Sequence, residues 1–175
     1  MNKNSPVYLG CFLAITAGIA GAALYGANAA TAPVIAANAE KAEKQSLLEM
    51  YPDANLDDFE TVSAEAITAD HPIVENVYKY GSDDVIFKCS VSGYDGGTVF
   101  LVSINVPENK VDSFKAISNG DTKGIGSQVM DQSYADTLIG KDASGDLDTI
   151  SGATYTSQPV VDAIHEVAEI AAQID

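Results

Sequence analysis

The chain has 175 residues, which suits one domain with an appendage. Nine lysines are its only basic residues, and 25 acidic residues bring the formal net charge to −16 and the pI to about 4.1. No basic stripe is present to neutralise phosphates, so the composition argues against nucleic acid as a partner. Every acidic residue lies from Glu40 onward, so the charge belongs to one part of the chain, which should be soluble.

The first 37 residues are predicted to form a membrane anchor. There is no charge from Asn4 to Ala39, and the apolar part, Val7 to about Ala30, would make a helix roughly 36 Å long, enough for a bilayer core of about 30 Å. A cleaved signal peptide is the alternative, because the sequence ANA at Ala27–Ala29 resembles a signal peptidase site. The apolar run is longer than a typical signal core, which favours a retained anchor.

Small residues recur every four positions along this anchor, at Gly10, Ala14, Gly18, Ala22, Gly26 and Ala30. Such a stripe lets another helix approach closely, which favours packing against partner helices in the membrane. An Ala/Gly-rich segment can also produce such a stripe by chance.

The orientation of the anchor follows only weakly from charge, because Lys3 precedes it while Lys41 and Lys44 follow it. A very short N-terminal tail usually stays in the cytoplasm. We therefore expect a single-pass protein of the cell membrane, with a cytoplasmic N-terminus and the large domain on the extracytoplasmic side.

Residues 38–70 are predicted to be a helical and irregular connector. Pro33 should end or bend the membrane helix, and Ala39 to Pro52 has the pattern of a short amphipathic helix stopped by Pro52. The acidic stretch from Asp53 to Asp70 has weak periodicity, so we expect it to be irregular.

Residues 71–175 are predicted to form one small α+β domain with an antiparallel sheet and a C-terminal helix. The candidate strands are Ile73–Tyr80, Val85–Gly93, Thr98–Val106 and Val111–Ile117, with the turn Ser92–Gly97 making a hairpin of the second and third. A second glycine-rich loop, Ser118–Ser127, and a short helix, Asp131–Ile139, follow.

The last helix is the clearest element, because apolar residues recur at helical spacing from Ser157 to about Gln173. Ser157 or Thr156 could cap it, and Pro159 would sit in its first turn. The N-terminus of a helix favours an anion, commonly a phosphate, because its first N–H groups are unpaired and the helix dipole is positive there.

The loop before this helix is unusually rich in small and hydroxyl residues: Ser151, Gly152, Ala153, Thr154, Thr156 and Ser157. A helix needs one capping hydroxyl, so the surplus suggests that the loop holds a ligand. A capped turn, with Gly152 in an unusual backbone conformation, is the alternative. No histidine or lysine lies nearby in sequence to activate a nucleophile. His71, His165, Cys11 and Cys89 are scattered, so we expect neither a metal site nor an internal disulfide.

Three motifs together resemble the FMN-binding domain family. The sequence DTISGAT, Asp148 to Thr154, resembles the Dxx[S/T]GAT flavinylation motif of that family. GYDGG at Gly93–Gly97 and DTKGIG at Asp121–Gly126 fall where the family has a GYxG turn and an ETxGxG-like loop. The motif order matches, and the resemblance covers roughly residues 73–172. Asp121 replaces the usual glutamate, and Gly97 stands where an apolar strand residue is common.

This resemblance implies that Thr154 carries FMN through a phosphoester bond. It also implies a separate flavin transferase, which recognises a segment that includes Asp148. The residues implied to surround the flavin are Tyr94, Asp121, Thr122, Lys123, Gly124, Ile125 and Gly126 at its ring or ribityl chain, and Ser151, Gly152, Ala153, Tyr155 and Thr156 near the attachment. Lys123 would stabilise a reduced, anionic flavin, or it is a solvated lysine; the sequence leaves both open.

Within the family, the short length and the N-terminal anchor are most similar to flavin subunits of Rnf-type electron-transport complexes. That similarity implies ferredoxin:NAD+ oxidoreduction coupled to transport of Na+ or H+, other membrane subunits as partners, and no complete reaction from this chain alone. The alternatives are the longer flavin subunit of a sodium-translocating NADH:quinone reductase, a stand-alone extracellular FMN-domain electron carrier, and a flavin-free anchored binding module.

Overall fold

The computed structural model describes residues 6–63 and 65–174, and the chain divides into two compact units after Ala42. The first unit consists of most of helix α1 (Pro6–Met50). Its N-terminal stretch is long and apolar enough to cross a membrane, and none of that stretch is buried within the protein.

Of the two outcomes predicted at Pro33, an end or a bend of the helix, helix α1 shows that the first is wrong. The helix does not end there but continues to Met50, so the predicted separate helix from Ala39 is its C-terminal part. Proline at this position removes the hydrogen bond to the carbonyl of Ala29, which costs a helix interior about 3 kcal/mol. Alanine-rich flanks, which have the highest helix propensity, help to keep the helix continuous.

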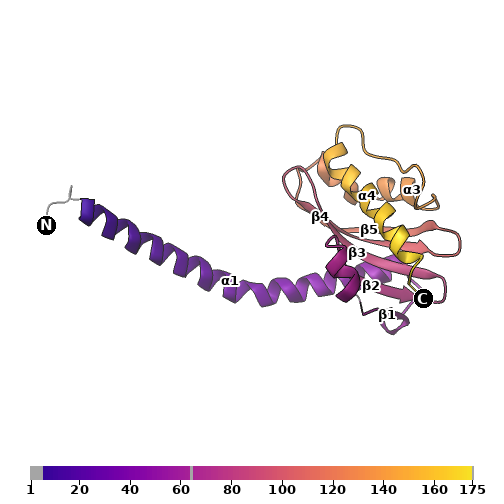
Figure 1. Cartoon of the computed structure of the whole chain (residues 1–175), viewed down its shortest axis with the longest axis horizontal. Coiled ribbons are helices and arrows are strands. Elements are labelled where there is room, and N and C mark those ends of the chain that lie inside the picture. The colour runs from indigo at the N-terminus through magenta and orange to yellow at the C-terminus, as the bar shows by residue number, and fades with distance from the viewer. Residues whose placement is uncertain (1–5, 64, 175) are drawn as a thin grey trace. The chain divides into compact units, whose positions relative to one another are not determined.

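The second unit is built on a five-stranded antiparallel sheet whose strands lie in chain order (Figure 1). The strands are β1 (Phe59–Thr61), β2 (Val74–Tyr80), β3 (Asp84–Ser92), β4 (Gly97–Asn105) and β5 (Lys110–Asn119). The four predicted strands and the hairpin between β3 and β4 are confirmed. The α+β fold is therefore as predicted.

The stretch predicted to be irregular contains three short elements: a 3-10 helix (Leu56–Asp58), strand β1, and helix α2 (Glu65–Asp70). The prediction of irregular structure was wrong for these residues. Strand β1 has three residues, too few to show a period, and it is specified by pairing with β2, where Phe59 lies opposite Tyr80.

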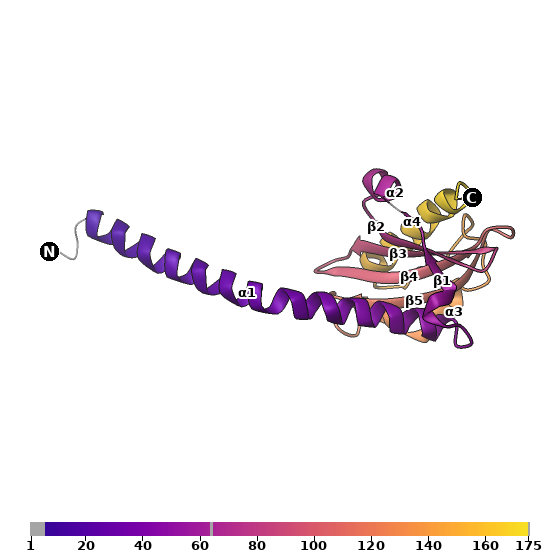
Figure 2. The same cartoon turned by 90° about the horizontal axis from the view of Figure 1, so that it is seen from below.

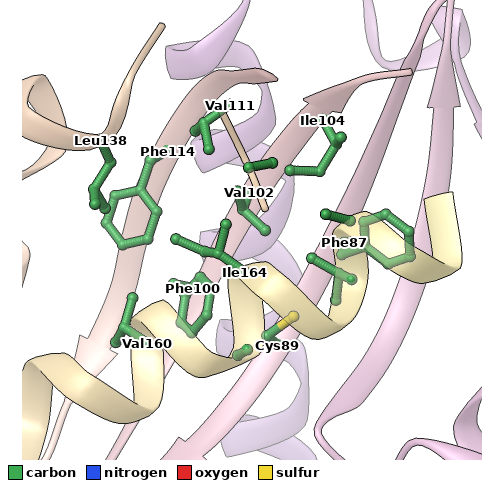
Figure 3. Packing of buried hydrophobic residues seen from close by; sticks show 14 of the residues in the cluster. Phe87, Cys89, Phe100, Val102, Ile104, Val111, Phe114, Leu138, Val160 and Ile164 are labelled. Carbon is green, nitrogen blue, oxygen red and sulfur yellow. The ribbon is translucent and has the colours of Figure 1, made fainter. Parts of the chain in front are cut away.

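One face of the sheet carries the main core. It is covered by a 3-10 helix (Gly126–Met130), helix α3 (Gln132–Leu138) and helix α4 (Thr154–Ala171), and Figure 2 shows α4 along this face. Alternate residues of the strands, among them Phe87, Cys89, Phe100, Val102 and Phe114, pack against Leu138, Val160 and Ile164 from the helices (Figure 3). The apolar residues at every second position of the strands thus pack against the apolar stripe of α4.

The opposite face of the sheet packs against the last two turns of α1. Leu47 is buried there with Ile86 and Leu101, and the carboxylate of Glu43 accepts hydrogen bonds from Asn76 (3.0 Å) and Tyr78 (2.5 Å). The same carboxylate pairs with the Lys88 ammonium at 2.9 Å. The residues from Glu43 onward therefore belong to the folded domain.

Candidate functional site

The three sequence motifs converge on one cleft of about 320 Å³. Its lining residues come from the turn between β3 and β4, from the loop after β5 and from the start of α4: Tyr94, Asp121, Thr122, Ile125, Gly126, Gly152, Ala153, Tyr155 and Thr156. Each of these residues was a candidate from the sequence. Segments that are up to about sixty positions apart in the chain thus form a single concave surface, as expected of a small-molecule site.

The start of α4 differs from the prediction. The helix begins at Thr154, three residues earlier than expected, with Ala153 at its N-cap. Neither predicted hydroxyl caps it, because Thr156 donates to Asp121 and Ser157 bonds to Ala153 and Ile150. Pro159 is consequently in the second turn of the helix rather than the first.

Gly152 turns the chain into the helix. Its φ of +83° lies in the left-handed region, which a residue with a side chain rarely adopts, so the expectation of an unusual backbone angle there is confirmed. The N–H of Ala153 donates to the carbonyl of Ile150 at 2.9 Å and closes this turn. The turn leaves the side chain of Thr154 exposed at the beginning of α4.

Thr154 lies beside the cleft rather than in its lining. It borders an adjoining hollow of about 290 Å³ together with Tyr155, Gln158, Pro159 and Asp162, and Tyr155 lines both spaces. The N–H groups of Thr154 and Tyr155 are the first two of the helix and have no acceptor within it. An anion next to the Thr154 hydroxyl would therefore meet unpaired donors and the positive end of the helix dipole.

Asp121 lines the cleft, although only 9% of its surface is exposed. One carboxylate oxygen accepts hydrogen bonds from the N–H groups of Asp95 (2.9 Å) and Gly96 (2.7 Å). The other accepts from the Thr156 hydroxyl at 2.5 Å. Burial alone would raise the pKa of the Asp121 carboxyl, but these hydrogen bonds, led by that of Thr156, outweigh it and lower the pKa.

The glycines of the motifs leave room for this carboxylate. A Cβ atom at Gly93 would collide with the Asp121 carboxylate, and one at Gly126 would lie 2.5 Å from the Asp121 Cβ. At Gly97 a side chain is excluded by a different contact, because a Cβ atom there would be 2.9 Å from the carbonyl oxygen of Val91. This contact accounts for glycine at a position where an apolar residue was expected.

Three of the residues that line the cleft have large apolar side chains that are exposed to solvent. Tyr94 is 74% exposed, Tyr155 78% and Ile125 50%. The two tyrosine rings meet edge to face, with their centroids 6.1 Å apart. Exposed aromatic groups at the mouth of a concave site can cover a flat aromatic ligand.

The remaining candidates lie outside the cleft lining. Lys123, Gly124 and Ser151 are exposed on the adjacent loops. Asp148 is also exposed and borders a separate hollow of about 220 Å³ that includes Tyr134. Across residues 6–63 and 65–174, no group of three or more histidine, cysteine, aspartate or glutamate side chains is placed to hold a metal ion.

Sequence reasoning missed the neighbours of Thr154 on α4, which are Gln158, Pro159 and Asp162. A signal for Gln158 existed, because residues four apart on a helix lie on the same face. It could not be used while the helix was expected to begin at Ser157.

Comparison with known proteins agrees with this geometry. Residues 93–169 match the model of the FMN-binding domain family, so the match includes the turn, the loop and most of α4. The chain is 29% identical to a component of the ion-translocating oxidoreductase complex of Methanosarcina acetivorans, in an alignment that covers 73% of each chain. The predicted resemblance to this family, and to a subunit of an ion-translocating oxidoreductase complex, is confirmed.

Proposed function

We propose that this chain, which carries a region of the FMN-binding domain family, is a membrane-anchored flavoprotein subunit of an Rnf-type ion-translocating oxidoreductase. The observation that supports this most is the convergence of all three motifs on one cleft beside Thr154. The name of the relative supports membership of such a complex, and the apolar part of α1 supports an anchor.

The residues present fit an FMN group with its phosphate at Thr154. Tyr94, Tyr155 and Ile125 offer apolar surface for the ring, and the glycines keep side chains out of the space above Asp121. The start of α4 offers unpaired N–H groups for the phosphate. We propose that a flavin transferase moves the FMN group of a flavin donor to the hydroxyl oxygen of Thr154. The bond between this oxygen and the phosphorus forms as the bond from the phosphorus to the rest of the donor breaks, and the hydroxyl proton goes to that leaving group.

A phosphate linkage suits a subunit that only passes electrons on. FMN supplies the redox chemistry when bound, and attachment through its phosphate leaves the ring system chemically unchanged. The residues around the cleft would then set how readily the ring is reduced. On the extracytoplasmic side a dissociated flavin could not be replaced, so a covalent bond prevents its loss. The complex would couple ferredoxin:NAD+ oxidoreduction to transport of Na+ or H+.

The intact mass of the full-length protein, made in membranes with and without the flavin transferase, tests the flavin proposal. With the transferase, the mass should rise by one FMN minus water, and visible flavin absorbance should survive denaturation. Protein of unchanged mass in both preparations would leave the flavin-free binding module as the better explanation. Recovery of other membrane subunits with the native protein distinguishes a complex subunit from a stand-alone electron carrier.

The proposed topology has its own test. A reporter that is active only in the cytoplasm, fused after residue 175, should be silent if the flavin domain is extracytoplasmic. A periplasmic or extracellular reporter at the same site is the matched control and should be active. The reverse pattern would contradict the topology and remove the reason given for covalent retention.

A further inference from the structure

The carboxylate of Asp121 binds two separate parts of the cleft at once. Oδ1 accepts from the backbone of the turn between β3 and β4, at Asp95 and Gly96, and Oδ2 accepts from Thr156 on α4. We propose that Asp121 is a positioning residue whose carboxylate clips this turn to the first turn of α4. The consequence of the clip for the flavin rests on the proposed function, whereas the clip itself does not.

The hydrogen bonds leave Asp121 little capacity for a ligand of its own. An ionised carboxylate has about four acceptor positions; Asp95, Gly96 and Thr156 fill three of them, and the backbone of Tyr94 also donates to it. The side chain is also almost completely buried. Its main interactions are therefore with the protein, although it lines the cleft.

The clip affects Tyr94 and Tyr155, the two exposed tyrosines of the cleft, through the residues next to them in the chain. Tyr94 directly precedes Asp95, and Tyr155 directly precedes Thr156. Each ring is thus attached one residue away from a donor to the same carboxylate, so the clip should fix the position of the two rings, whose centroids lie 6.1 Å apart. Thr154 directly precedes Tyr155 and belongs to the same first turn of α4. Hydrogen bonds to an ionised group are about twice as strong as those between neutral groups, so the connection should be stiff.

The alternative is that Asp121 caps the turn between β3 and β4 independently, and the bond to Thr156 adds nothing to that turn. The two explanations differ in what happens to the turn when the bond on the helix side is lost. Thr156→Val removes the hydroxyl and keeps the shape, whereas Thr156→Ser keeps the hydroxyl. Both variants retain Asp121, whose own replacement could prevent folding.

Amide hydrogen exchange of the full-length protein, prepared without flavin transferase, decides between them. In Thr156→Val the carboxylate of Asp121 loses its partner on α4 and should hold the turn less firmly. The amides of Asp95 and Gly96, which bond to this carboxylate, should therefore exchange about tenfold faster or more. In Thr156→Ser their exchange should stay within about twofold of wild type. If Thr156→Val accelerates only the amides at the start of α4, Asp121 caps the turn alone and the clip is refuted.

A second measurement examines the consequence for the flavin. When the transferase is present, the visible circular dichroism of the attached FMN should change in Thr156→Val and return to the wild-type shape in Thr156→Ser. An unchanged spectrum in Thr156→Val would show that the clip does not set the surroundings of the ring. If wild-type protein gains no flavin, the proposed function fails, and the exchange data still decide whether the clip exists.

Discussion

The hydroxyl of Ser157 accepts a hydrogen bond from the backbone N–H of Ile150, seven residues earlier, at 2.9 Å. The same hydroxyl donates to the carbonyl of Ala153 at 3.1 Å, and Ser157 is completely buried. One side chain therefore joins both sides of the turn that carries Gly152. This explains why the loop before α4 needs more than one hydroxyl, and why Ser157 lies inside the helix instead of capping it.

We predict that Ser157→Ala lowers the free energy of unfolding by about 1–3 kcal/mol, because the N–H of Ile150 loses its partner inside the protein. Denaturant unfolding of the detergent-solubilised protein measures this change. Ser151→Ala is the control, since Ser151 is exposed and its loss should change stability by no more than about 0.5 kcal/mol. Equal losses in the two variants would contradict the role given to Ser157.

The lowered pKa of Asp121 predicts how stability depends on pH. A carboxyl whose pKa is lower in the folded than in the unfolded state stabilises the fold above its ordinary pKa of about 3.9. That contribution is lost as the pH falls through the folded value. Asp121→Asn should therefore be less stable than wild type near neutral pH, and the difference should shrink below about pH 3.9. A difference that stays constant with pH would show that the charge of Asp121 is not involved.

The sequence was sufficient for the elements with a long, regular pattern. Strands β3 and β4 could be predicted from runs of β-branched and apolar residues bounded by turn residues, and the body of α4 from apolar residues at helical spacing. The start of α4 could not, because the partners of Thr156 and Ser157 are set by the tertiary fold. A hydroxyl near a helix start has the same sequence signature whether it caps the helix or bonds to Asp121.

The site shows the same division between local and tertiary information. The three motifs and the two residues that follow the last of them, Tyr155 and Thr156, include every residue that lines the cleft. They did not reveal that Asp121 faces the protein, nor why Gly93 must be glycine beside it. Both depend on two loops approaching each other, and neither loop contains that information alone.

Tyr134 and Tyr51 allow a paired test of what a tyrosine hydroxyl contributes to stability. The hydroxyl of Tyr134 is buried without a hydrogen-bond partner among the residues that the structure describes, while its ring packs edge to face on Phe114. The hydroxyl of Tyr51 bonds to both Ser103 and Asp112 at 2.7 Å. We expect Tyr134→Phe to be neutral or to stabilise the protein by up to about 1 kcal/mol, and Tyr51→Phe to destabilise it by about 1–3 kcal/mol. Thermal and denaturant unfolding of both variants measure these effects; a large loss in Tyr134→Phe would reveal a partner for its hydroxyl.

The small residues of α1 predict how the proposed subunit would join a membrane complex. Gly18 and Ala22 are exposed on the helix, and a Cβ atom at Gly18 would meet nothing in this chain. If a partner helix packs closely there, replacing both residues with leucine should reduce co-purification of the other membrane subunits. The flavin content of the domain should not change. Replacing Leu13 and Leu24 with isoleucine is the control, and assembly that tolerates the Gly18 and Ala22 changes equally well would refute close packing at the stripe.

The last prediction concerns the attachment of FMN to Thr154. Thr154→Val removes the hydroxyl oxygen that would bond to the phosphate and leaves a side chain of nearly the same shape. Because Thr154 is exposed, stability should change by no more than about 0.5 kcal/mol. Flavin fluorescence should nevertheless disappear from the denatured protein on a gel. Thr154→Ser is less decisive, because a serine hydroxyl could still accept the group.

The choice of control for this experiment follows from the structure. Thr156→Val looks like the natural control from the sequence, but its hydroxyl is buried and bonded to Asp121, so the variant disturbs the cleft itself. Thr149→Val is better matched, because Thr149 is exposed and lies in the same loop at a position that the motif leaves free. Its denatured band should fluoresce like wild type.

Two outcomes would contradict the proposal. A fluorescent Thr154→Val band would place the flavin on another residue, because valine has no hydroxyl oxygen to bond to the phosphate. If wild-type protein made with the transferase is also dark, the flavoprotein proposal itself fails, because the same preparation contains every residue that the attachment requires.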